Sequence, residues 1–333
     1  MTAAAPPQPV SRSDPYLARL RAYMRERFPL FGHVLLIVSY YSSNQFLARF
    51  LSNPGEPMQY TLRSLLGALT LLFFFFHLRV FDEHKDFAED SRFHPQRVLQ
   101  RGVITLADLR VLGALCTAAD HGLATTAGSA ALTALALAFG FSLLMLKEFF
   151  AKEWLKKHFL VYATSHMLLM PLLSLMVYSF ATRRMPWQAP GVFWVYAFVG
   201  FFVTFNVEVS RKIRAPEDEV PGLDSYSKIF GTYGAAWMVL GLRVIDTTLV
   251  SIVGHAIGVS VWFYVAVLAL LVVTLGTFIG FRRNTNARTA KALERNAGLH
   301  LIAFDLILAG ELVCMQGFAS RPVEAGKKME EAY

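Results

Sequence analysis

The sequence has little cysteine and little charge for its length. Only two of its 333 residues are cysteines, Cys116 and Cys314, and both lie in apolar stretches. This argues against a disulfide framework and against a cysteine-based metal site. Charged residues make up 17% of the chain and hydrophobic residues 55%, whereas a soluble protein normally carries about 25% charged residues. These shortages argue against an ordinary soluble domain and indicate a membrane protein.

The N-terminus also lacks the apolar core and the cleavage site of a signal peptide. We therefore expect a disordered tail over residues 1–15. The following stretch, YLARLRAYMRERF, gathers its tyrosines and leucines on one helical face, which predicts an amphipathic helix in the membrane interface over residues 16–28. We expect a transmembrane domain over residues 29–319 and a C-terminal tail over residues 320–333.

Several windows of about 20 residues are almost free of charge, and about 20 residues is the length that a helix needs to cross a hydrocarbon core of ~30 Å. We count nine such windows, so the sequence predicts an all-α, multi-pass membrane protein with nine transmembrane helices. The third window is the weakest, because CTAADHGLATTAG must supply both its end and a turn. The expected spans are residues 29–48, 62–78, 106–123, 128–146, 159–181, 191–209, 229–252, 259–281 and 298–318.

The basic residues test this segmentation independently. If the N-terminus is cytoplasmic, the inner segments carry 24 Lys and Arg residues and the outer segments carry seven. The positive-inside rule predicts such an asymmetry. The net charge of +8 therefore indicates topology and contact with anionic lipid, and no nucleic-acid binding. We expect an integral protein of a bacterial plasma membrane with a cytoplasmic N-terminus.

Acidic residues gather where the second expected span ends. The stretch RVFDEHKDFAEDSRFHPQRVLQRG, residues 79–102, carries Asp82, Asp86 and Asp90 at every fourth position. A continuous helix would place these carboxylates on one face, about one turn apart. Three like charges repel, and Mg²⁺ that bridges carboxylates to a phosphate would remove this repulsion. The alternative is a solvated helix end whose acids pair with nearby Lys and Arg residues.

A second polar stretch, NVEVSRKIRAPEDEVPGLDSYS, begins where the sixth expected span ends. It includes Glu208, Glu217 and Asp218 together with basic residues. Both stretches would emerge on the cytoplasmic side, so they can face one cavity. Acids with Arg and Lys at the same opening suit a metal-bridged polyanion, above all a diphosphate. The candidate phosphate-binding residues of this second stretch are Arg211, Lys212 and Arg214.

Two further basic residues are candidates for the same phosphate. Arg97 follows the first acids in RVLQRG, and Lys147 ends the fourth expected span. Each has a simpler alternative: Arg97 fits the positive-inside pattern, and Lys147 fits a lysine that extends its ammonium group to the membrane interface. Within the seventh span, Arg243 and Asp246 lie three residues apart, and we expect them to neutralise each other.

With both stretches considered, the sequence resembles the UbiA superfamily of intramembrane prenyltransferases over roughly residues 25–320. That family has nine transmembrane helices and an Asn-x3-Asp-x3-Asp motif after the second, and the three aspartates at positions 82, 86 and 90 match it with Asp in place of Asn. The segment RVLQRGVIT is similar to the family's Arg-Pro-Leu segment, with Arg97 at its arginine. Lys147 stands where the family has a diphosphate-contacting lysine at the end of helix four.

The second stretch departs from the family's Asp-x3-Asp motif. Asp218 matches the last aspartate, but Arg214 stands where the earlier aspartate belongs. Either Glu208 and Glu217 supply the missing carboxylates, or this half binds phosphate through its basic residues with fewer metal contacts. The sequence therefore resembles a divergent branch of the family.

The resemblance implies a helical bundle whose central cavity is capped by cytoplasmic loops. It further implies Mg²⁺-dependent transfer of an isoprenyl group from a (poly)prenyl diphosphate to an aromatic or other lipophilic acceptor within membrane lipid. The implied catalytic residues are Asp82, Asp86, Asp90 and Asp218, and the implied metal ligands are these four with Glu208 and Glu217. The implied diphosphate ligands are Arg97, Lys147, Arg211, Lys212 and Arg214.

Other functions are alternatives. An intramembrane terpene cyclase of the same fold would ionise the same diphosphate and let the cation attack its own double bonds. A transporter can also carry acids and bases at helix ends, but transport predicts charges near the bilayer midplane on broken helices, whereas these acids lie at helix ends. A CDP-alcohol phosphotransferase would need an Asp-Gly-x2-Ala-Arg-type signature, which the sequence lacks.

Overall fold

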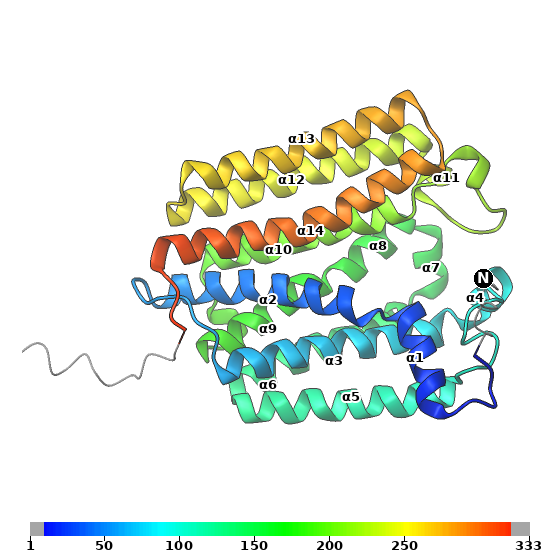
Figure 1. Cartoon of the computed structure of the whole chain (residues 1–333), viewed down its shortest axis with the longest axis horizontal. Coiled ribbons are helices and arrows are strands. Elements are labelled where there is room, and N and C mark those ends of the chain that lie inside the picture. The colour runs from blue at the N-terminus through cyan, green and yellow to red at the C-terminus, as the bar shows by residue number, and fades with distance from the viewer. Residues whose placement is uncertain (1–9, 321–333) are drawn as a thin grey trace, which may run out of the picture.

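The computed structural model describes residues 10–320, so residues 1–9 and 321–333 of the expected tails lie outside the described part. Long helices run side by side and are connected alternately at the two ends of the molecule (Figure 1). The described residues contain no β-strand, only an isolated bridge between Met58 and Phe318. The prediction of an all-α protein is confirmed.

Each expected span coincides with a long helix, except that residues 159–181 form two consecutive helices that meet at Leu168. In chain order, the helices are α1 (Tyr16–Arg27), α2 (Leu30–Ser52), α3 (Leu62–Lys85), α4 (Phe87–Phe93), α5 (Leu106–Ala127), α6 (Ser129–Leu146), η1 (Glu148–Phe150), α7 (Lys152–Lys157), α8 (Phe159–Met167), α9 (Leu169–Thr182), η2 (Pro186–Gln188), α10 (Gly191–Arg211), η3 (Pro216–Asp218), α11 (Tyr226–Phe230), α12 (Thr232–Ile257), α13 (Val261–Arg283) and α14 (Ala287–Gln316).

Seven helical segments are long and apolar enough to cross a membrane: α3, α6, α8 with α9, α10, α12, α13 and α14. The chain is therefore a multi-pass integral membrane protein. The two other expected spans form α2 and α5, which are not among these seven. Both belong to the bundle, since α2 packs against α9 and α14, and α5 against α3 and α6. Nine membrane crossings stay a prediction.

Local sequence explains where several helices begin and end. Thr61 caps α3 and Thr105 caps α5, each through a reciprocal capping box with the third residue of its helix. Between α5 and α6, Gly128 has a φ of +113°, a backbone conformation that glycine adopts without steric cost. This glycine ends α5 at Ala127, so the helix extends past its expected end at residue 123.

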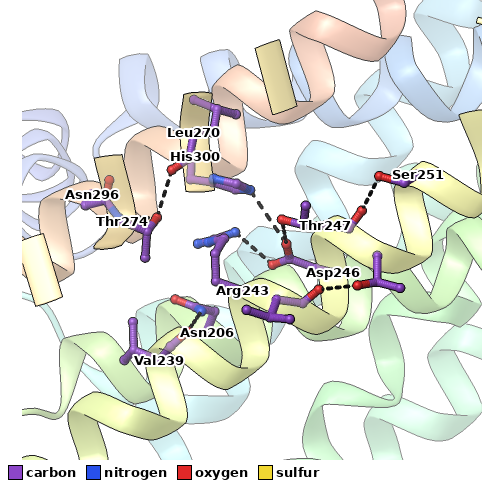
Figure 2. Close-up of polar contacts among 12 residues, drawn as sticks. Asn206, Val239, Arg243, Asp246, Thr247, Ser251, Leu270, Thr274, Asn296 and His300 are labelled. Atoms are coloured by element: carbon purple, nitrogen blue, oxygen red, sulfur yellow. Dashed lines mark hydrogen bonds and ion pairs between the residues drawn. The ribbon is translucent and has the colours of Figure 1, made fainter. Parts of the chain in front are cut away.

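A polar network is enclosed between α12 and α14 (Figure 2). Arg243 Nη1 donates to Asp246 Oδ2 at 2.8 Å, and Asp246 Oδ1 lies 3.9 Å from Nε2 of His300 on α14. None of these three side chains is more than 2% exposed. Arg243 and Asp246 thus neutralise each other, as their spacing predicted. Because α12 is unbroken here, the pair does not have the discontinuous-helix setting typical of transport sites.

Candidate functional site

The two polar stretches lie at the same end of the bundle, near α1, α4 and α11 (Figure 1). They approach closely at Gly222 of the second stretch, where an added Cβ would lie 3.5 Å from Cζ of Phe93 in the first. Arg211 interacts electrostatically with Asp82 across the two stretches. Segments that are far apart in the sequence thus meet to form one charged surface.

The first stretch is not one continuous helix. α3 ends at Lys85, Asp86 forms its C-cap, and α4 starts as a separate helix at Phe87. Asp82 and Asp86 keep helical spacing, since the Asp86 N–H donates to the Asp82 carbonyl at 2.9 Å, but Asp90 belongs to α4. The three aspartates therefore do not lie on one continuous helix.

Asp82 and Asp86 carry the least neutralised of these carboxylates. The Asp82 side chain is 50% exposed, and its one ion pair with another described residue places Oδ1 3.9 Å from Nζ of Lys85. Asp86 makes no ion pair within residues 10–320. Partial burial and the negative charges of its acidic neighbours raise the pKa of Asp86 to about 6, although Lys85 opposes this shift. Negative charge is therefore concentrated here, which is the setting that a bound cation stabilises.

Asp90 is neutralised by two arginines. Its Oδ2 lies 2.5 Å from Nη1 of Arg97 and 3.4 Å from Nη2 of Arg27 on α1. Arg27 also forms a 2.7 Å ion pair with Glu83, whose side chain is fully buried. The structure thus pairs a predicted metal ligand, Asp90, with a predicted phosphate ligand, Arg97. Sequence reasoning missed the role of α1 here, because Arg27 and Glu83 are 56 positions apart and no local pattern links them.

The second stretch contains a similar pairing. Glu208 lies 2.6 Å from Nη2 of Arg211 and 2.7 Å from Nζ of Lys212, all at the end of α10. A predicted metal ligand again neutralises predicted phosphate ligands. Glu217 and Asp218 are instead exposed on η3, and no side-chain hydrogen bond or ion pair of either is found in the described part of the chain.

Arg214 belongs to the second stretch and lies near His94 of the first. Its backbone N–H donates to Oγ of Ser227 at 2.7 Å, while its guanidinium group has no hydrogen bond or ion pair within residues 10–320. Partial burial lowers the pKa of His94 in the first stretch, and the positive charges of Arg97 and Arg214 contribute to this shift. The side chain of Arg214 is therefore close to both polar stretches and is not neutralised by either.

Lys147 is exposed at the C-terminus of α6, and the described residues offer it no ion pair. The three residues after it, Glu148, Phe149 and Phe150, have φ of +48°, +52° and +58°, which is a left-handed turn that L-residues rarely adopt. In this turn the Phe149 ring lies 5.6 Å from that of His166. Sequence reasoning missed this turn because none of the three residues is a glycine.

Lys85 is another residue that sequence reasoning missed as part of the site. Its Nζ donates to Oη of Tyr162 at 2.9 Å and lies 5.5 Å from the centroid of that ring. With Asp82, Ser142 and His166, Lys85 lines a cavity of about 20 Å³. The sequence feature that could have identified Lys85 as part of the site is its position directly before Asp86. A central cavity wide enough for an isoprenoid chain stays a prediction.

No group of three or more carboxylate, histidine or cysteine side chains is gathered for a metal ion within residues 10–320. Mg²⁺, however, is usually bound by one or two carboxylates and takes its other ligands from phosphate oxygens and water. Asp82 and Asp86 are adjacent and weakly neutralised. The residues therefore fit a Mg²⁺ ion held jointly with a diphosphate, and they do not form a complete metal site of their own.

Comparisons with known proteins give a consistent picture. The model of the UbiA prenyltransferase family matches residues 45–302. A solved structure from a study of digeranylgeranylglyceryl phosphate synthase in membranes aligns with a TM-score of 0.60 and 15% identity, over 89% of this chain and 99% of that one. The apo structure of a UbiA homologue from Aeropyrum pernix K1 aligns with a TM-score of 0.64 and 15% identity, over 85% and 97% of the two chains. No curated protein sequence matches significantly.

Proposed function

The chain belongs to the UbiA prenyltransferase family, and from this premise we propose that it transfers an isoprenyl group from a (poly)prenyl diphosphate to a lipophilic acceptor in the membrane, with Mg²⁺. The observation that supports this most directly is the close approach of the two polar stretches, where a Cβ added to Gly222 would lie 3.5 Å from Cζ of Phe93. Carboxylates and guanidinium groups at one opening can hold a metal and a diphosphate together. That arrangement stabilises the negative charge that develops on the leaving group.

In this proposal, the ion pairs within each stretch describe the site before the diphosphate binds. Asp90 is paired with Arg97, and Glu208 with Arg211 and Lys212. An incoming diphosphate competes for these basic side chains, because it carries more negative charge than a carboxylate. The released carboxylates of Asp90 and Glu208 then become available as additional metal ligands. The side chains of Lys147 and Arg214 have no ion pair to lose in the described part of the chain and can bind phosphate at once.

The chemistry of the proposed reaction is simple. The bond between C1 of the allylic group and its oxygen breaks, and the electron pair leaves on pyrophosphate. A nucleophilic atom of the acceptor forms the new bond to C1 and loses its proton to solvent. Mg²⁺ at Asp82 and Asp86 would supply positive charge to the leaving pyrophosphate. The basic residues orient the diphosphate, and Asp218 with Glu217 would complete the metal site from η3.

The membrane arrangement that we propose has nine crossings, with α2 and α5 added to the seven apolar segments. The polar stretches then face the cytoplasm, because most Lys and Arg residues lie in the segments at that end.

Incubation of the purified protein with Mg²⁺ and labelled isoprenyl diphosphates of several chain lengths tests this function. We expect a prenylated product that forms only when a membrane lipid extract supplies an acceptor, and no product without Mg²⁺. A labelled hydrocarbon or alcohol formed without extract would indicate cyclisation or hydrolysis instead. Absence of pyrophosphate release under every condition would contradict the proposal.

A further inference from the structure

At the end of the bundle opposite the candidate functional site, three arginines line a cavity of about 300 Å³. Arg49 comes from the last turn of α2, Arg63 from the first turn of α3, and Arg183 directly follows α9. Figure 1 shows that these helix ends lie at the end of the molecule remote from α1 and α4. Three segments that are distant in sequence thus contribute one cation each to a single cavity, which we call the arginine cavity.

The guanidinium groups of the arginine cavity are only partly neutralised. Arg63 donates from Nε to the Phe180 carbonyl at 3.2 Å and from Nη1 to the Ala127 carbonyl, but its buried Nη2 has no hydrogen-bond partner. Buried Nε of Arg49 has none either, and among residues 10–320 the one ion pair of Arg49 joins its Nη2 to Oε2 of Glu56 at 3.7 Å. Buried N–H groups without an acceptor are unfavourable, so a ligand with acceptor oxygens would stabilise this arrangement.

Topology does not explain this concentration of positive charge. Basic residues are scarce at this end: among the described residues that connect or end its helices, they are Arg49, Arg63, Arg183 and Arg184. Three of the four line the same cavity. Arg63 and Arg183 are also close enough to repel each other. Like charges brought together in a cavity, against the general distribution of charge, indicate an anionic ligand.

We propose that the arginine cavity binds a phosphate group. Guanidinium groups present paired N–H donors that match phosphate oxygens. The cavity also includes Thr61 and Ser64 at the start of α3. Their backbone N–H groups are already satisfied by the capping box, but the dipole of the helix favours an anion at this end. Two sources share this chemistry: the headgroup of an anionic phospholipid and free inorganic phosphate. The arginine cavity is separate from the proposed diphosphate site. The result of its test therefore does not depend on whether the prenyltransferase proposal is correct.

Binding of inorganic phosphate to delipidated, purified protein tests the proposal by isothermal titration calorimetry. Arg183→Gln removes an exposed cation that has no hydrogen bond within residues 10–320, so the fold is retained. Since a charge-assisted contact is lost, we expect about tenfold or greater weakening of binding. Arg49→Gln is the second test variant. Arg184→Gln is the matched control, because Arg184 is adjacent in sequence but does not line the cavity.

Native mass spectrometry after reconstitution with phosphatidylglycerol, or with phosphatidylcholine as comparison, tests the lipid source. Retained phosphatidylglycerol that is lost in Arg183→Gln and Arg49→Gln, and kept in Arg184→Gln, supports a lipid headgroup. Phosphate binding with the same pattern of variants supports free phosphate. Failure of the wild type to bind either probe would overturn the proposal, as would equal binding by the wild type and all three variants.

Discussion

Asp86 is the residue on which the proposed metal chemistry depends most. It joins α3 to α4, has acidic neighbours on both sides, and makes no ion pair within residues 10–320. Its neighbour Asp82 has a weak contact with Lys85, whereas Asp90 is held by two arginines. A cation arriving with its diphosphate would therefore meet Asp82 and Asp86 before Asp90.

We expect Asp86→Asn to abolish turnover and leave the protein folded, because the variant loses a metal ligand and relieves repulsion among acids. Glu89→Gln, which changes an exposed acid on α4, is the control and should keep its activity.

The pKa of Asp86, about 6 in the folded state, exceeds the unfolded value of about 3.9. Between pH values of about 3.9 and 6, the folded state binds more protons than the unfolded state. The contribution of the Asp86 carboxyl to the free energy of unfolding therefore falls as the pH rises through this range.

The wild-type rate should fall as pH decreases through 6, since protonation removes the ligand, and Mg²⁺ should shift this midpoint to lower pH. Rate profiles at two Mg²⁺ concentrations measure the effect. Near-normal activity of Asp86→Asn would contradict the assignment of Asp86 as a metal ligand.

At the scale of elements, α2 and α3 approach closely at Gly67. A Cβ added there would lie 2.2 Å from Oη and 2.8 Å from Cζ of Tyr41, and Tyr41 is only 2% exposed. We expect Gly67→Ala to destabilise the protein by about 1–3 kcal/mol, because the enclosed ring cannot move away without disturbing its neighbours. Gly140→Ala on α6 has no atom within 4 Å and should be neutral or stabilising. Thermal unfolding in detergent compares them, and equal midpoints would contradict this close packing.

The buried pair of Arg243 and Asp246 lies within α12 and faces His300 of α14 (Figure 2). We expect Asp246→Ala to cost about 3–5 kcal/mol, since it leaves a buried guanidinium group without its partner. The double variant Arg243→Met/Asp246→Leu should be less destabilised than the single variant, because no buried charge is left. Denaturant unfolding of both variants and the wild type measures the difference. A double variant at least as unstable as Asp246→Ala would show that the charges do not act as a pair.

The sequence predicted the helices far better than the contacts between them. Apolar windows found each long helix, because length and hydropathy are local properties. The break at Asp86 was missed, since the i, i+4 spacing of acids is equally compatible with one helix or two. The pairing of Arg27 with Glu83 and Asp90, and that of Lys85 with Tyr162, depend on segments brought together by the fold. No spacing within one segment could show them.

At the scale of the whole molecule, the basic segments lie at one end, together with the polar stretches (Figure 1). We expect this end to face the cytoplasm. Single cysteines placed in residues 91–96 and 220–224, in a background with Cys116 and Cys314 replaced, should react with a membrane-impermeant maleimide only after the cells are opened. Labelling of either loop in intact cells would contradict the proposed topology. It would mean that the orientation is reversed or that the two loops lie on opposite sides of the membrane.

The central claim is that both polar stretches bind one diphosphate together with Mg²⁺. Isothermal titration with a non-hydrolysable isoprenyl thiodiphosphate, at low and high Mg²⁺, tests it most directly. We predict Mg²⁺-dependent binding by the wild type and about 10- to 150-fold weaker binding by Arg214→Ala at both concentrations, because a charge-assisted contact is lost. Asp218→Ala should instead require more Mg²⁺, and Lys228→Ala, exposed just beyond the second stretch, should match the wild type. Wild-type affinity that is independent of Mg²⁺, or equal affinity of Arg214→Ala and the wild type at both concentrations, would contradict a shared diphosphate site.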